Sequence, residues 1–253
     1  TKRGGIGTDI TSNYHPDRDS DQYGIDGYMT YNGPYRDKER GFIVESKNKK
    51  WGSYSKQKVK KHADDTLKKI EAANHSEDFD EFLNFNEPRI VNTAVLGMWV
   101  RDDDKFNSDT FRGWVNNIPV RPKKQTFQIL ALGNDQLNRL ASLHSQFMDL
   151  KSEDKDAKFF YPSQGDSGST RSDLLTVEYM LSDYVFAELT KKESIGNITR
   201  DVDVGVVFFF DDITLDALNF MYRAVLRYTL DNVEELRIYI YEDEDDEDRE
   251  LQL

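Results

Sequence analysis

The sequence predicts an α/β protein, and three observations lead to that fold class. Apolar runs of strand length alternate along the chain with segments whose apolar residues recur at helical spacing. One run, residues 90–100, is apolar throughout, which is typical of a strand buried on both faces. Towards the end of the chain a strand, a helix and a strand follow with short links, which indicates a parallel pair and a right-handed crossover.

In the first 104 residues the expected order is loop, strand, strand, helix, strand. Residues 1–22 are polar and rich in Gly and Asp, and we expect a loop. Residues 26–31 and 42–47 read as strands joined through the turn residues Asn32-Gly33-Pro34. Ser53 or Ser55 is expected to cap the following helix. Its inner face is predicted from helical spacing to consist of Val59, Ala63, Leu67 and Ile70.

The second part of the chain alternates again. Residues 105–124 are polar and irregular, so we place a boundary or a long insertion there. The predicted strands are 126–132, 204–210 and 236–241, the predicted helices are 136–150, 173–192 and 214–230, and 152–172 is a predicted polar loop.

Composition limits the class of protein. The chain has 253 residues, no Cys and a formal net charge of −13. Without Cys there are no disulfides, no thiol nucleophile and no Cys-ligated metal. No apolar run approaches the ~18–20 residues of a membrane span, and the N-terminal residues do not resemble a signal peptide. We therefore expect a cytoplasmic protein with no membrane partner.

The charge is distributed unevenly. Residues 242–250 contain eight acids and one Arg, whereas residues 36–61 contain ten Lys or Arg and three acids. Local potential governs contact with phosphates more than the total charge does. The side chains expected to bind nucleic acid are Lys49, Lys50, Lys56, Lys58, Lys60 and Lys61. The competing interpretation is a solvated helix face without a ligand.

A candidate catalytic site lies within the same region. Asp26 begins one predicted strand, and Glu45 and Lys47 end the next. Strand side chains alternate, so Glu45 and Lys47 share a face, and Asp26 joins them if the two strands are neighbours. Asp26, Glu45 and the carbonyl of Ser46 are oxygen ligands of the kind that Mg²⁺ prefers. Lys47 would position a water or stabilise charge developing at phosphorus. This set indicates phosphodiester hydrolysis.

The segments Gly24-Ile25-Asp26-Gly27 and Glu45-Ser46-Lys47 resemble the motif of the PD-(D/E)xK nuclease superfamily, which includes restriction endonucleases and many repair and phage-defence nucleases. The resemblance covers roughly the first 100 residues and implies a restriction-endonuclease-like mixed sheet flanked by helices; the alternation of strands and helices described above predicts additional βα units in the C-terminal half. It implies Mg²⁺ as the cofactor, with Mn²⁺ able to substitute. It also implies a polar catalytic residue on the following helix, which Gln57 matches. The leading Pro of the family motif is replaced by Ile25, and no helix is evident before the first strand.

From these features we expect a PD-(D/E)xK-like nuclease core over residues 1–104, an α/β region over 105–241 and an acidic tail over 242–253. The expected function is metal-dependent cleavage of DNA, with RNA left open, in a phage-defence or restriction setting. A homo-oligomer or a partner protein such as an ATPase or sensor subunit would provide control. The alternatives are a non-catalytic scaffold or regulatory subunit, and a degenerate nuclease fold that binds nucleic acid without cleavage.

Overall fold

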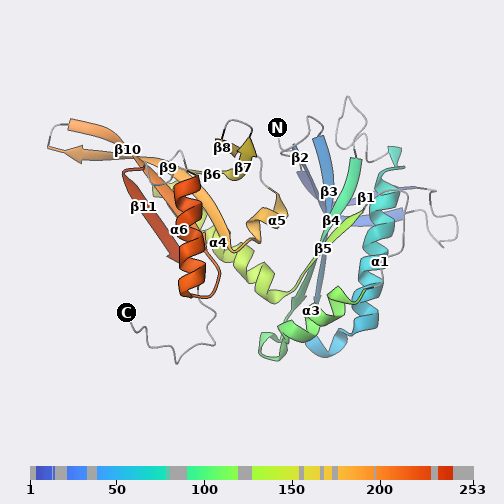
Figure 1. The fold of residues 1–253 in the computed structure, drawn as a ribbon. Coiled ribbons are helices and arrows are strands. Elements are labelled where there is room, and N and C mark those ends of the chain that lie inside the picture. The colour runs from blue at the N-terminus through green and yellow to red at the C-terminus, as the bar shows by residue number, and fades with distance from the viewer. Residues whose placement is uncertain are drawn as a thin grey trace. The chain divides into compact units, whose positions relative to one another are not determined.

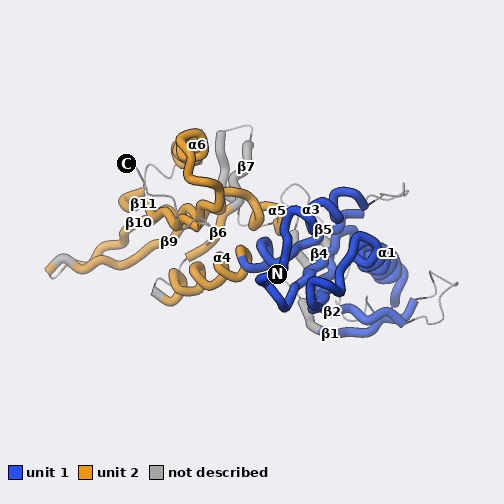
Figure 2. The backbone as a smooth tube through the Cα atoms, turned by 90° about the horizontal axis from the view of Figure 1, so that it is seen from below, with its two compact units in different colours: residues 1–138 blue, residues 139–253 orange. Residues whose placement is uncertain are grey.

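The computed structural model describes residues 4–12, 14, 22–32, 39–77, 79, 90–118, 127–153, 157–165, 168–172, 176–196, 198–228 and 233–241 (Figure 1). It consists of two units, residues 1–138 and 139–253 (Figure 2). The three-part division expected from the sequence stays a prediction. The acidic run 242–250 lies outside the described residues.

Unit 1 is built on a mixed sheet of five strands in the order β1-β2-β3-β4-β5. The strands are β1 (Gly4–Thr11), β2 (Gln22–Asn32), β3 (Glu39–Lys49), β4 (Ile90–Val100) and β5 (Gln128–Leu132). The helices are α1 (Lys56–Ala73) and α3 (Ser108–Asn116), with the 3-10 helices η1 (Trp51–Ser53) and η2 (Asp103–Lys105). The pairs β1·β2 and β2·β3 are antiparallel, whereas β3·β4 and β4·β5 are parallel. The predicted mixed sheet flanked by helices is confirmed.

Strand β1 corrects the expectation of a loop over residues 1–22. It pairs antiparallel with β2, with Ile6 opposite Gly27 and Thr8 opposite Ile25. Gly7, which lies between these pairs and opposite Asp26, has a φ of 61°, a conformation that glycine adopts without a steric penalty. The prediction failed because ladder hydrogen bonds to a neighbouring strand can hold even a Gly-rich segment extended, and the local sequence does not reveal that neighbour.

Helix α1 begins as predicted. Its N-cap is Ser55, whose side chain accepts a hydrogen bond from the backbone N–H of Lys58. The buried side chains of the helix include Val59, Ala63, Thr66 and Ile70. Leu67, expected on this face, is only half-buried. The buried residues Leu96, Met98 and Val100 of β4 share a hydrophobic cluster with Val59 and Ala63, so α1 covers this face of the sheet.

Helix α3 occupies part of the segment expected to be irregular. Its N-cap Asn107 accepts a hydrogen bond at 2.7 Å from the backbone N–H of Thr110. Phe111 is buried in the cluster under α1, and Trp114 stacks on Trp51 with ring centroids 4.9 Å apart. The helix is only nine residues long, so its apolar period is too short to stand out against the polar residues around it.

Unit 2 contains a four-stranded sheet in the order β11-β10-β9-β6 and the separate hairpin β7-β8. Its strands are β6 (Lys158–Phe159), β7 (Tyr161–Gly165), β8 (Gly168–Ser172), β9 (Tyr184–Ile195), β10 (Ile198–Phe209) and β11 (Glu235–Ile240). The helices are α4 (Asn134–Glu153), which starts in unit 1, α5 (Val177–Met180) and α6 (Leu215–Arg227). Strands β10 and β11 are parallel and are joined through α6, as the sequence predicted.

Two expectations for unit 2 are wrong. The predicted polar loop 152–172 contains β6, β7 and β8, and the predicted helix 173–192 is the short α5 followed by β9. Strand β9 pairs with β10 over its whole length and buries Val185, Phe186, Ala187 and Leu189. The helix-forming residues Glu188, Lys191 and Lys192 suggested a helix, but pairing with a buried strand outweighs that weak local preference.

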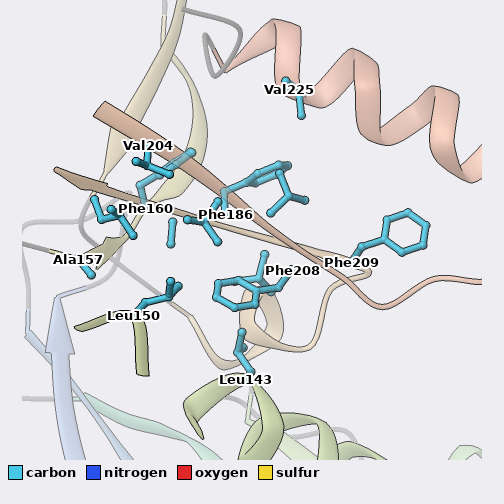
Figure 3. Packing of buried hydrophobic residues seen from close by; sticks show 14 of the residues in the cluster. Leu143, Leu150, Ala157, Phe160, Phe186, Val204, Phe208, Phe209 and Val225 are labelled. Atoms are coloured by element: carbon cyan, nitrogen blue, oxygen red, sulfur yellow. The ribbon is translucent and has the colours of Figure 1, made fainter. Parts of the chain in front are cut away.

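The core of unit 2 lies on both faces of β10 (Figure 3). Phe208 points towards Leu143 of α4 in this view, while Val225 projects from α6. Both Phe208 and Phe209 are fully buried although they are consecutive, so the two faces of β10 are covered. Among the described residues, no helix is long and apolar enough to cross a membrane.

Candidate active site

Strands β2 and β3 bring Asp26 beside the predicted motif. Their antiparallel register pairs Gly27 with Val44, which sets Asp26 level with the Glu45–Ser46 segment. Oδ2 of Asp26 accepts hydrogen bonds from the backbone N–H of Ser46 at 2.7 Å and from its hydroxyl at 3.1 Å. Partial burial would raise the pKa of Asp26. The Ser46 hydrogen bonds and the positive charges of Lys47 and Lys69 outweigh this effect, so the pKa lies below its usual value.

Glu45 is the buried acid of the site, with 1% of its side chain exposed. It lies on the face of β3 that α1 covers, beside the buried Leu96 of β4. Its Oε2 accepts from Nζ of Lys47 at 3.2 Å and from Nζ of Lys69 at 2.6 Å. Its Oε1 is buried and has no hydrogen-bond partner within the described part of the chain. An unsatisfied buried acceptor costs about 1–3 kcal/mol, so this oxygen marks a position that favours a further cation or a water.

The ammonium group of Lys47 lies where the predicted metal ligands converge. Its Nζ is 3.2 Å from Oε2 of Glu45, 3.9 Å from Oδ2 of Asp26 and 3.0 Å from the carbonyl oxygen of Ser46. These three oxygens are the ligand set predicted from the sequence. A single cation already contacts all of them, and in this arrangement it is the protein's own lysine. The oxygens of Asp26, Glu45 and Ser46 therefore surround one position that is suited to a cation.

The donors at this point fit a hard divalent ion. Two carboxylates and one carbonyl are oxygen ligands, and Mg²⁺ typically keeps several waters beside such a small protein set. The unsatisfied Oε1 of Glu45 adds a further acceptor. Within the described residues, no cluster of three or more His, Cys, Asp or Glu side chains suited to a metal is present. Any ion bound at this point would therefore depend on Asp26, Glu45 and the Ser46 carbonyl.

Lys69 is a site residue that the sequence did not reveal. It lies on α1, 19% of its side chain is exposed, and it makes the shortest described ion pair of Glu45. The basic run drew attention only to lysines at the start of the helix. Lys69 stands three residues after the buried Thr66, and this helical spacing was the one available indication that it faces the sheet.

Gln57 is not brought to this cluster. It is exposed in the first turn of α1 and precedes Lys69 by twelve residues, about 18 Å along the helix axis. Its catalytic role stays a prediction, and the polar residue of α1 that contacts Glu45 is Lys69.

Neighbouring groups fix the end of β3. The hydroxyl of Tyr54 donates to the carbonyl of Lys47 at 3.0 Å, and burial raises the pKa of Tyr54 to about 12. On α1, Nε2 of His62 lies 3.4 Å from Nζ of Lys49. Burial lowers the pKa of His62, and the charges of Lys49 and Lys47 lower it further. A neutral His62 therefore accepts from Lys49, which holds that lysine beside the strand.

The predicted nucleic-acid-binding lysines fall into two groups. Lys49 contacts His62, Lys58 donates to the Ser53 carbonyl at 2.9 Å, and Lys60 pairs with Asp64. Lys50, Lys56 and Lys61 are exposed, as is Lys58 apart from this one hydrogen bond. Arg36 and Lys38, which belong to the same basic run, lie outside the described residues. The assignment of all six lysines to nucleic-acid binding stays a prediction.

Comparison with known families adds to this geometry. The model of one family, described as "GAPS4 protein PD-(D/E)XK nuclease domain", matches residues 2–136, a segment that contains Asp26, Glu45 and Lys47. No match was found among curated proteins. The family match confirms the predicted superfamily and supports a nuclease. Because more than half of the chain is matched, the chain belongs to the family of GAPS4 PD-(D/E)XK nuclease domains.

Proposed function

We propose that this protein is a Mg²⁺-dependent nuclease that hydrolyses phosphodiester bonds of DNA, with Mn²⁺ able to replace Mg²⁺. The observation that carries the proposal is the convergence of Asp26, Glu45 and the Ser46 carbonyl on one cation, the ammonium of Lys47. DNA is the proposed substrate because the motif resembles that of restriction endonucleases.

Asp26, Glu45 and the Ser46 carbonyl would hold the ion. The ion, when bound, would neutralise phosphate charge and supply a polarised water. Lys47 emerges from the same strand face as Glu45, so its ammonium would remain close enough to orient that water or to stabilise charge developing at phosphorus. Lys69 contacts only Glu45 among the acids of the site, and its role would be to hold that carboxylate in place.

The exposed Lys50, Lys56 and Lys61 would contact the phosphates on either side of the cleaved bond. Such contacts release counterions, so binding should weaken steeply as salt is raised. They carry no sequence information, since phosphate contacts position a duplex and base contacts read it. We therefore propose that the exposed lysines contribute affinity and not sequence preference.

The test combines cleavage with metal binding. Purified protein is incubated with double-stranded DNA, single-stranded DNA and RNA, with Mg²⁺, with Mn²⁺ or with EDTA. Calorimetry with Mn²⁺ is performed in parallel on the wild type, Glu45→Gln and Lys68→Met. Lys68 is an exposed lysine on α1, and its substitution serves as a control for the effect of changing a charge outside the cluster. We expect Glu45→Gln to lose both metal binding and cleavage, and Lys68→Met to keep both.

Other outcomes would favour other functions. Cleavage that persists in EDTA or in Glu45→Gln would refute the proposed site. Salt-dependent DNA binding without cleavage under any metal condition would favour a degenerate nuclease fold. The absence of both metal and DNA binding would favour a scaffold or regulatory subunit. Cleavage of RNA alone would leave the site intact and change the substrate. A phage-defence setting, a controlling partner protein and a cytoplasmic location stay predictions.

A further inference from the structure

The edge of the unit 2 sheet carries an exposed apolar surface. Strand β11 is the last strand of the order β11-β10-β9-β6, so its outer edge has no strand partner among the described residues. Along β11 the exposed side chains are Leu236, Ile238 and Ile240, at 39%, 40% and 48% exposure. They alternate with Glu235, Arg237 and Tyr239, which belong to the other face.

Helix α6 lies on the same sheet face as these three residues. Ile240 is the register partner of Phe209, so the two side chains share a face. Phe209 contacts the ring of Tyr184, which in turn contacts Phe220 of α6, with centroids 5.4 and 5.6 Å apart. Figure 1 shows α6 running beside β11 within this unit.

The flank of α6 that faces β11 is also apolar. Phe220 marks the flank towards Tyr184 on β9, and Tyr222 lies about 200° further around the helix axis. On this second flank Leu215, Tyr222 and Leu226 recur at spacings of seven and four and are 76%, 60% and 42% exposed. We call this flank together with Leu236, Ile238 and Ile240 the β11–α6 face.

We propose that the β11–α6 face is the interface of a twofold-symmetric homodimer, in which β11 pairs antiparallel with β11 of a second copy. An unpaired edge strand offers its free N–H and C=O groups to another strand, and a twofold axis places the same strand opposite itself. The two sheets then form one continuous sheet of eight strands across the axis, and no further partner is needed to cover the edge.

The side chains of β11 favour a register centred on Ile238 over one centred on Arg237. Centring the axis on Ile238 pairs Leu236 with Ile240 of the second copy and keeps every apolar side chain on the α6 face. Centring it on Arg237 would oppose two like charges directly, which destabilises a sheet. In the Ile238 register Arg237 faces Tyr239 instead, and its charge is already balanced by Glu235 at 2.6 Å.

The area and the charges also suit a second copy. The six exposed side chains offer about 600 Å² if a large apolar residue presents about 200 Å², against about 800 Å² per partner in a standard interface. The paired β11 backbones and the polar side chains at the edge of the interface would supply the remaining area of about 200 Å². The two α6 helices would be separated by three strand spacings, about 14 Å, and the side chains of Tyr222, Leu226 and Ile238 would fill the space between them. Antiparallel pairing sends the two Tyr241 residues to opposite ends, so the acidic runs that follow them do not start side by side.

The first test measures mass in solution. Light scattering on the full chain at about 10 µM should give twice the 29.4 kDa of the chain. Ile238→Lys buries a charge at the axis in both copies and should raise the dimer Kd by at least about 100-fold. Tyr222→Lys, on an exposed position of α6, should weaken the dimer without affecting folding. Ile198→Lys is the control, because Ile198 is an exposed apolar residue of the same sheet, at 71% exposure, but precedes the first residue of β10 that pairs with β11 by six positions.

The second test determines the register in which the two β11 strands pair. The chain contains no Cys, so a single introduced thiol is the only one available for oxidation. Residue 238 of each copy faces itself across the axis at a Cβ separation of about 4.5–5.5 Å, so Ile238→Cys should form a disulfide-linked dimer readily. In Leu236→Cys the two thiols are four strand residues apart, about 13 Å, and should not link. A monomeric wild type, a dimer unaffected by both lysine variants, or equal cross-linking at 236 and 238 would overturn the proposal.

Discussion

Replacing Lys69 by Met should destabilise unit 1 in metal-free buffer by about 1–3 kcal/mol. At an effective dielectric constant of about 20, unit charges 2.6 Å apart, as in Lys69 and Glu45, attract by about 6 kcal/mol. Lys47 lies 3.2 Å from the same oxygen, and its own attraction to Glu45, about 5 kcal/mol at the same dielectric constant, remains in the variant. Breaking a buried ion pair usually costs about 3–5 kcal/mol, and the attraction that Lys47 retains brings the expected cost below that range.

Tryptophan fluorescence in urea is the appropriate assay. The three tryptophans of the chain, Trp51, Trp99 and Trp114, all lie in unit 1, so their emission follows the unfolding of that unit. With a denaturant slope of about 2 kcal/mol per molar, the midpoint should fall by about 0.5–1.5 M. Added Mn²⁺ should recover more stability in Lys69→Met than in the wild type, because the ion meets one competing cation fewer at Glu45.

Lys68→Met is the control for this prediction, since Lys68 is exposed on the same helix and the substitution removes the same charge. If Lys69→Met and Lys68→Met unfold at the same urea concentration, Lys69 does not stabilise Glu45 and the reasoning is wrong. A lower midpoint that Mn²⁺ does not restore would show that Lys69 supports packing and not the carboxylate.

Four other substitutions test the remaining contacts. Lys47→Met should lower DNA cleavage by at least about 100-fold while calorimetry shows Mn²⁺ binding undiminished, because the ammonium competes for the ligands but assists the chemistry. Gln57→Ala should cleave DNA at the wild-type rate, since Gln57 lies about 18 Å along α1 from Lys69; a large loss would restore its catalytic role. The folded pKa of His62 lies below the ordinary 6.5, so its contribution to stability is complete above that value and is lost as pH falls. In urea titrations between pH 7 and pH 5, His62→Asn should therefore lose less stability than the wild type. Gly7→Ala should lower the unfolding free energy by about 1 kcal/mol because φ is 61° there, and an unchanged urea midpoint would contradict that.

The sequence predicted the nuclease motif and the strands that carry it, because each part has a local signature. Alternation places Glu45 and Lys47 on one face, and the apolar run 90–100 indicates a central strand. Ser55, a residue type that commonly caps helices, is the N-cap of α1. These features depend on a few neighbouring residues, so no knowledge of the tertiary structure was needed to find them.

The elements that were missed depend on contacts distant in sequence. Strand β1 is held by β2, and β9 is held by β10, while the local residues of each favour another structure. Lys69 belongs to the site only because α1 packs over β3, and the spacing along the chain between Glu45 and Lys69 does not reveal this. Gln57 was expected in the site because the resemblance implies a polar residue on the helix that follows Lys47, but Gln57 lies about 18 Å along the axis of α1 from Lys69, which contacts Glu45.

The position of the Lys47 ammonium has a consequence for how the site would be loaded. A cation tethered to the same strand competes with any free ion at a high effective concentration, so the ligands alone would bind metal more tightly than the whole site does. A substrate phosphate would offer the displaced ammonium a new partner. Metal and DNA should then bind cooperatively, each raising the affinity of the other by the same factor. Such a nuclease would hold little metal at rest and become loaded chiefly when its substrate is present.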